Sequence, residues 1–155
     1  MEIIPLLRKR LKDDEIIELL EWMDAEVIYD FDRSHENMPD LYWVTSREHG
    51  ITLRFDDNQI LHTVFIYMQP SEEHEAAHRS LFADIAFFDT DSQVQKYAAD
   101  RGIHVATGSR PAVLPPTGSW VRLDYDHHRV HYDFGGGTLS IVTISSTNEP
   151  TVASS

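Results

Sequence analysis

The stretch of sequence that decides the fold is ITLRFDDNQILHTVFIY, from Ile51 to Tyr67. Its two ends, 51–55 and 60–67, are rich in β-branched and aromatic residues, which favour strands. The four polar residues between them, 56–59, suit a tight turn because Asp and Asn side chains bond to nearby backbone groups. The stretch therefore predicts a β-hairpin. With the apolar run 41–44 before it, the hairpin becomes a three-stranded antiparallel meander.

A helix and one more strand are expected before this meander. Apolar residues recur at helical spacing over 13–24, and Asp13 is a suitable N-cap. Apolar and polar residues alternate from Val27 to Phe31, which predicts a strand. A polar loop should follow over 34–40.

The second half of the chain repeats this order. A helix is predicted from about Thr90 to Asp100, closed by Gly102, and a strand at 103–105 follows it. Three later parts match the first half in order: Trp120-Val121 matches Trp43-Val44, 130–134 matches 51–55, and 139–144 matches 61–66. The match in order indicates an internal duplication.

The sequence thus predicts an α+β fold made of two tandem helix plus antiparallel β-meander repeats, whose strands form one or two packed antiparallel sheets. We expect the first repeat over 1–69, a joint over 70–84 and the second repeat over 85–145. Residues 146–155 are rich in Ser and Thr and poor in large apolar residues, so we expect a disordered tail.

Negative charge is concentrated in one part of the chain. The net charge is −13, and 11 acidic residues lie between Asp13 and Asp40, where Arg33 is the single base. Within the expected helix, Glu15, Glu18 and Glu21 have no base four residues further on. This stretch is either a solvated face or a docking face for a basic protein. Nucleic acid is not an expected ligand, because an acidic chain repels phosphate.

The composition points to the bacterial cytoplasm. The chain has no cysteine, so it has no disulfide and no thiolate nucleophile. The apolar residues near the N-terminus precede the bases at 8–12, which is the wrong order for a signal peptide. No apolar run has the roughly twenty residues of a membrane span, so we expect no membrane association.

Two resemblances extend over most of the chain. The tandem architecture is similar to that of beta-lactamase inhibitor protein and of the small outer-membrane assembly lipoproteins, although this chain lacks the cysteine that those lipoproteins lipidate. The residues that run from Asp30 to Trp43, with 50–55 and 64–67, resemble small acidic bacterial immunity-type proteins encoded beside toxins. The resemblance implies binding and inhibition of another protein, and it brings no catalytic residue and no cofactor.

Three other groups of residues contain side chains that could carry chemistry. His74-Glu75-Ala76-Ala77-His78 fits the zinc-hydrolase pattern HExxH, but its polar flanks predict a short turn without an apolar anchoring face. His127, His128 and His131 lie around a predicted hairpin, where we expect a solvated polar face. Asp124 and Asp126 form a carboxylate pair on a strand without the burial that tunes acid–base groups.

We therefore expect a cytoplasmic immunity or inhibitor protein that binds and neutralises a basic toxin or effector domain, such as a nuclease. It should have no catalytic residue, no metal and no cofactor. The alternatives are a generic adaptor or effector chaperone and, more weakly, a zinc-dependent hydrolase that uses His74, Glu75 and His78. The expected partner-binding residues are Asp30, Asp32, Glu36, Asp40, Tyr42, Asp124, Tyr125 and Asp126.

Overall fold

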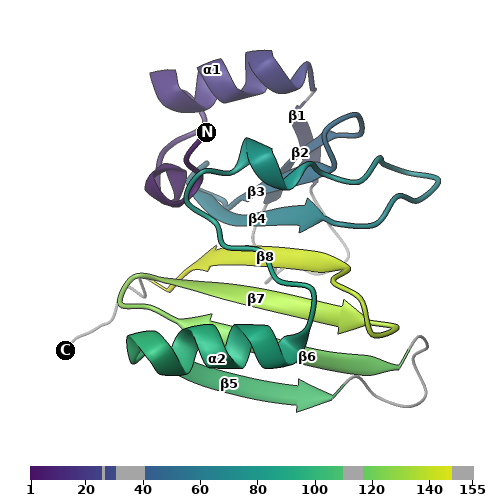
Figure 1. Ribbon diagram of the computed structural model, residues 1–155. Coiled ribbons are helices and arrows are strands. Elements are labelled where there is room, and N and C mark those ends of the chain that lie inside the picture. The colour runs from purple at the N-terminus through teal and green to yellow at the C-terminus, as the bar shows by residue number, and fades with distance from the viewer. Residues whose placement is uncertain (26, 31–40, 110–116, 148–155) are drawn as a thin grey trace. The chain divides into compact units, whose positions relative to one another are not determined.

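The computed structural model describes residues 1–25, 27–30, 41–109 and 117–147. It confirms the α+β class, with two compact units that each contain one α-helix and four antiparallel strands (Figure 1). The first unit ends at Ile85 and the second begins at Ala86. None of the helices in these described ranges is long and apolar enough to cross a membrane.

The first unit forms one antiparallel meander in the strand order β1-β2-β3-β4. Its elements are η1 (Ile4–Leu6), α1 (Asp14–Met23), β1 (Val27–Asp30), β2 (Leu41–Ser46), β3 (Ile51–Phe55), β4 (Leu61–Tyr67) and η2 (Arg79–Leu81). The predicted meander therefore gains a fourth strand, because β1 pairs with β2. Asp13 holds the N-cap position of α1 as predicted, but its carboxylate accepts from Arg10 N at 2.7 Å and makes no bond to the helix.

The second unit has the same order of elements: α2 (Asp91–Arg101), β5 (His104–Ser109), β6 (Gly118–Asp124), β7 (His128–Gly135) and β8 (Ile141–Ser146). Helix α2 begins with a capping box, in which the hydroxyl of Thr90 accepts from Gln93 N and the Gln93 amide oxygen accepts from Thr90 N, both at 3.3 Å. It ends at Gly102, as predicted. After β8, Thr147 N donates to His127 O at 3.1 Å.

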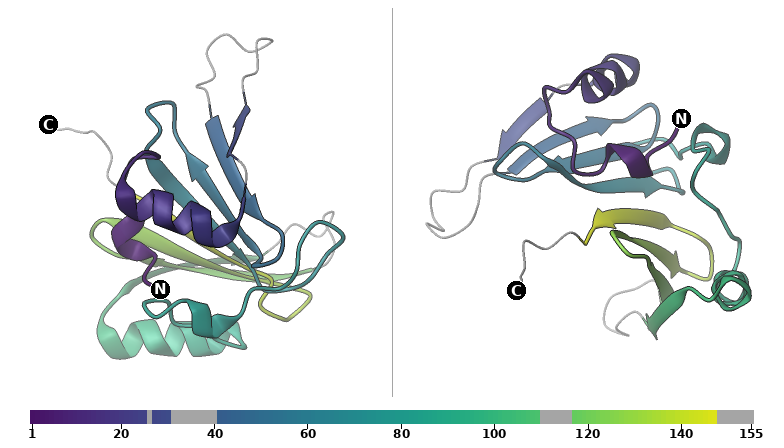
Figure 2. Two further views of the ribbon diagram at one scale, coloured as in Figure 1. Left: turned by 90° about the horizontal axis from the view of Figure 1, so that it is seen from above. Right: turned by 90° about the vertical axis from the view of Figure 1, so that its left-hand side faces the viewer.

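Each helix covers one face of the sheet in its own unit (Figure 2). Helix α1 packs on β2, and α2 packs on β5 and β6. The helices contribute Ile16, Leu19, Met23, Val94 and Ala98 to the core, and the strands contribute mainly Val44, Leu53, Phe55, Val64, Ile66, Val121, Leu123, Tyr132, Phe134, Val142 and Ile144. Burial of these apolar side chains supplies most of the stability of both units.

The two meanders share one strand register. Trp43 lies opposite Arg54, and Trp120 lies opposite Asp133 at the corresponding place. The inward pairs follow with the same offset: Val44 with Leu53 and Leu53 with Val64 in the first unit, and Val121 with Tyr132 and Tyr132 with Val142 in the second. The residues that matched in the sequence therefore match in register as well.

Two large apolar residues, Phe65 of β4 and Ile141 of β8, do not enter the core and lie on the other face of their sheets. Phe65 and Ile141 are half-buried, while their neighbours Val64 and Val142 are fully buried. The ring of Phe65 stacks on Trp43 of β2, with a centroid distance of 6.3 Å and an interplanar angle of 22°. The face of the first sheet that α1 does not cover thus carries its own aromatic pair.

Candidate partner-binding surface

The expected binding residues of the first unit lie mostly outside the described part of the chain. Asp32, Glu36 and Asp40 fall in the segment 31–40 that the structure does not describe. Asp30 is the last residue of β1. Tyr42 lies in β2 opposite Phe55 and is half-buried.

The expected residues of the second unit do not form an open acidic pair. The carboxylate of Asp124 contacts Arg122 Nε at 2.7 Å, Arg129 Nε at 3.3 Å and His104 Nδ1 at 2.9 Å. Its charge is therefore compensated within the chain. Asp126 is exposed in the turn after β6. Tyr125 is half-buried and stacks on His128 at 4.5 Å, and burial, together with a hydrogen bond to Tyr97, raises its pKa.

The ion pairs of Asp124 make the stability of the second unit depend on pH. Burial raises the pKa of Asp124, but the hydrogen bonds from Arg122 and His104 outweigh burial, so the net shift is downward. A carboxyl whose folded pKa is lowered stabilises the fold above its unfolded pKa of about 3.9, and loses that contribution as pH falls through the folded value.

We expect Asp124→Asn to lower the free energy of unfolding at neutral pH by about 1 kcal/mol, since the network is only partly shielded from water. The loss should shrink at acid pH, below the lowered pKa of Asp124, where the wild-type carboxyl is protonated as well. Urea denaturation at both pH values measures it. Asp126→Asn is the control, and as an exposed change it should stay within about 0.5 kcal/mol. An equal loss at both pH values would contradict the assignment.

The HExxH segment does not form the helix that its chemistry requires. Residues 74–78 have no regular secondary structure, whereas zinc hydrolases of this pattern place both histidines on one helical turn. The segment instead bonds along the edge of the first unit, with Glu75 N donating to Arg47 O at 2.8 Å and Ala77 N donating to Tyr67 O at 2.7 Å. His74 stacks on Tyr67 at 4.0 Å, while His78 is exposed.

The second group of histidines does not converge on one point. His131 is half-buried and stacks on Trp120 at 5.1 Å, and its burial lowers its pKa. His128 stacks on Tyr125, so only His127 of the three is exposed as predicted. Among the residues that the structure describes, no group of three or more His, Cys, Asp or Glu could hold a metal ion.

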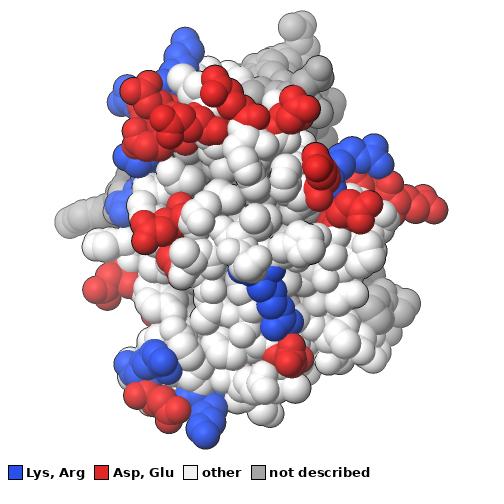
Figure 3. All heavy atoms as spheres, turned by 45° about the horizontal axis from the view of Figure 1, so that its top comes forward, with Lys and Arg blue, Asp and Glu red and all other residues white. Residues whose placement is uncertain are grey.

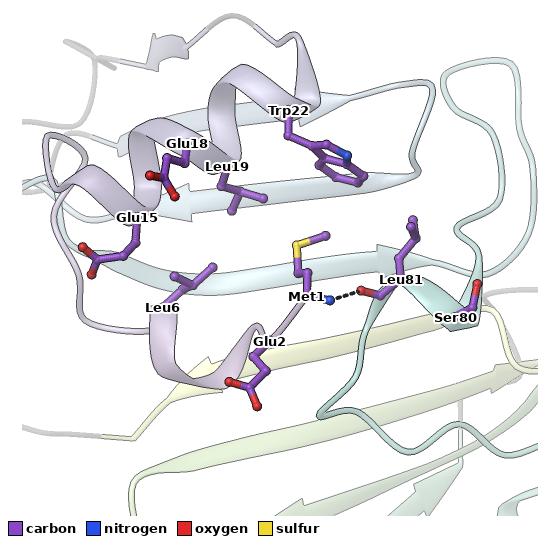
Figure 4. A pocket seen from close by; sticks show the side chains of 9 residues that line it. All are labelled: Met1, Glu2, Leu6, Glu15, Glu18, Leu19, Trp22, Ser80 and Leu81. Atoms are coloured by element: carbon purple, nitrogen blue, oxygen red, sulfur yellow. Dashed lines mark hydrogen bonds between the residues drawn. The ribbon is translucent and has the colours of Figure 1, made fainter.

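The structure places a pocket beside α1 that sequence reasoning missed. We call it the α1 pocket; its volume is about 500 Å³. It is lined by Met1, Glu2, Leu6, Glu15, Glu18, Leu19, Trp22, Ser80 and Leu81 (Figure 4). Trp22 is 41% exposed and Met1 38% exposed, and with Ile17 they are the exposed large hydrophobic residues of the described chain. The floor of the pocket is therefore apolar and accessible.

Backbone bonds between distant segments build one wall of the α1 pocket. The amine nitrogen of Met1 donates to Leu81 O at 3.0 Å, and Ala83 N donates to Met1 O at 2.8 Å. The carboxylate of Asp84 accepts from Ile3 N at 3.0 Å and from Ile4 N at 2.8 Å, so it satisfies two donors at the start of η1. These bonds hold residues 1–4 beside 81–84.

The carboxylates of Glu2, Glu15 and Glu18 belong to the lining of the α1 pocket, and further acidic residues lie along α1. Asp14, Glu15, Glu18 and Glu21 of α1 are all exposed. In the space-filling view acidic side chains gather over the part of the molecule where α1 lies (Figure 3). Glu15 pairs with Lys9 at 2.7 Å, and this bond lowers the pKa of Glu15. Within the described residues, no ion pair involves Glu2 or Glu18.

Comparison with known proteins finds no matching family model, no matching curated protein and no matching solved structure. The resemblances to immunity-type proteins and to beta-lactamase inhibitor protein therefore stay predictions. The functional proposal below therefore rests on the exposed apolar residues and carboxylates of the first unit.

Proposed function

We propose that this protein is an immunity or inhibitor protein that binds and neutralises a basic toxin or effector domain through the acidic surface of its first unit. One observation carries the proposal: α1 exposes Trp22 and Ile17 among four exposed carboxylates. Exposed large apolar side chains rimmed by polar groups mark interaction sites. Aromatic anchors supply most of the affinity of an interface, while surrounding charges steer the partner.

The sign of the charge selects the partner. A surface with uncompensated carboxylates attracts a basic protein and repels an acidic one, including nucleic acid. The helix α1 forms part of this surface. The segment 31–40, which lies outside the described residues, contains the expected binding residues Asp32, Glu36 and Asp40. Because α1 packs on β2, it offers a rigid helical surface for docking.

We expect charge reversal on α1 to slow association with the partner. The partner is first captured by co-purification from the native host and identified by mass. Glu18→Lys/Glu21→Lys should then lower the association rate about tenfold at low salt and change dissociation less, because exposed charges act mainly through steering. Surface plasmon resonance at low and high salt measures both rates, and the difference should shrink at high salt.

Two further double variants with the same change in charge serve as comparisons. Asp32→Lys/Glu36→Lys carries the same charge change and tests whether the segment 31–40 also contacts the partner. Glu72→Lys/Glu73→Lys reverses two exposed charges that belong neither to α1 nor to the lining of the α1 pocket, and it should have a smaller effect. If all variants associate as fast as the wild-type protein at low salt, the acidic surface is only a solvated face and does not steer the partner. A partner whose activity persists in the complex would favour the adaptor or effector chaperone.

We also infer that the two units are tandem repeats of one ancestral helix-plus-meander unit. The common strand order and the common register of Trp43 and Trp120 support this inference. Independent meanders have no reason to keep the same offset across two successive strand pairs.

A further inference from the structure

We propose that the α1 pocket receives an arginine side chain of the basic partner, an inference that rests on the proposed function and deepens it. The pocket combines apolar walls, an exposed indole and carboxylates at its edge. An arginine side chain has the complementary parts: an apolar stem, a planar cation that stacks on aromatic rings, and forked donors that suit carboxylates.

The apolar walls suit the stem of the side chain. In Figure 4 the side chains of Met1, Leu6 and Leu81 point toward α1, from which Leu19 points back toward them. They come from three segments, of which two are tied together by the bond from the Met1 amine to Leu81 O. Methylene groups of a long basic side chain would cover this surface while the charged head stays at the rim.

The indole of Trp22 is placed to stack on the guanidinium. One of its contacts is already fixed, because the imidazole of His49 lies against it with a centroid distance of 4.0 Å and an interplanar angle of 34°. This contact holds the ring while 41% of the residue stays exposed at the pocket. A cation above the face of a tryptophan ring is the most favourable of the cation–π arrangements.

The carboxylates decide between a cation and a neutral occupant. Glu15 is engaged by Lys9, whereas Glu2 and Glu18 line the same pocket without an ion pair among the described residues. An apolar partner alone would bring these charges close to a dry interface without compensation, which is costly. A guanidinium compensates them and offers hydrogen bonds to more than one carboxylate, which a compact lysine ammonium does less well.

The test uses the whole protein and short peptides. The probe is acetyl-Leu-Arg-Leu-amide, and its matched controls carry citrulline, which is neutral and nearly the same shape, or lysine at the central position. Two-dimensional nitrogen–proton NMR follows the indole N–H signals of the three tryptophans during titration. Loss of one signal in Trp22→Phe assigns Trp22, and Trp43 and Trp120 serve as internal references.

We expect the arginine peptide to shift the Trp22 signal in a saturable way and to leave Trp43 and Trp120 unmoved. The citrulline peptide should produce no saturable shift, and the lysine peptide a weaker one. Glu18→Gln should weaken the arginine peptide about three- to fivefold, as removal of one exposed charge pair does. Glu21→Gln, on the same helix but outside the pocket, should leave its affinity unchanged.

Two outcomes would overturn the arginine assignment: equal shifts with the arginine and citrulline peptides, or no shift of Trp22 at all. Neither outcome touches the inhibitor proposal, which is decided by the association kinetics of the charge-reversed variants with the captured partner. Conversely, saturable binding of the arginine peptide to Trp22 with unchanged kinetics of those variants would support the pocket and contradict the proposed docking face.

Discussion

Phe55→Ala should lower the free energy of unfolding by about 3–5 kcal/mol, because removal of a fully buried aromatic side chain leaves a cavity in the core. Phe55 is 0% exposed on the side of the first sheet that α1 covers. Its neighbours across the sheet are Tyr42 of β2 and Leu61 of β4, both held by backbone pairing, so the surrounding side chains have little freedom to fill the space. Urea denaturation followed by far-ultraviolet circular dichroism gives the value.

Phe65→Ala is the matched comparison, because it removes the same atoms from the opposite face of the same hairpin. Phe65 is half-buried and stacks on Trp43, so its loss should cost less than half as much as the loss of Phe55. Equal costs for the two substitutions would mean that the face not covered by α1 is as tightly packed as the core, contrary to the burial described above.

Gly50→Ala should be the second severe change, lowering the free energy of unfolding by about 2–5 kcal/mol. Gly50 has φ +66°, a left-handed conformation that costs other residues about 1–2 kcal/mol. A Cβ atom there would also lie 2.5 Å from Glu75 O and 2.8 Å from Ala77 N. Both are backbone atoms, so the segment 74–78 would have to move, and overpacking of this kind adds about 1–3 kcal/mol.

Gly102→Ala is the control that separates the conformational contribution to this loss of stability from the contribution of overpacking. Gly102 has nearly the same φ, +67°, at the end of α2, but nothing lies within 4 Å of the position that a Cβ would take. Its substitution should therefore show the conformational cost alone. If urea denaturation gives the same loss for Gly50→Ala and Gly102→Ala, the close approach of the segment 74–78 to Gly50 is not a tight constraint.

Local signals made much of the fold predictable. The hairpin 51–67 carries its own turn chemistry, and Thr90, Gln93 and Gly102 mark both ends of α2. The direction of side chains on β4 was not predictable in the same way, since apolar residues occur on both alternations of the strand. An irregularity between Arg54 and Phe55 shifts the register by one residue, so Leu61 and Val64 both reach the core and Phe65 does not.

Only the acidic part of the candidate site could be predicted from the sequence. The run of carboxylates on the first helix could be read directly, and it predicted an acidic face. The apolar floor could not, because it requires Leu81 to lie beside Met1, and the region 70–84 reads as a polar joint. The bonds of Asp84 to Ile3 and Ile4, with those between Met1 and residues 81–83, hold that region against the N-terminus. No local sequence pattern predicts contacts between residues so far apart in the chain.

The bond between Met1 and Leu81, which joins residues 80 positions apart, has a consequence for synthesis on the ribosome. Within the first unit, each of the strands β1 to β4 pairs with the next one in sequence, so this meander can assemble as soon as Tyr67 has left the exit tunnel. The wall of the α1 pocket that residues 1–4 and 81–84 build can form only after Asp84 has left the exit tunnel. A nascent chain halted between these two points would have the paired strands β1 to β4 but not the α1 pocket, so the pocket forms later than the meander that supports it.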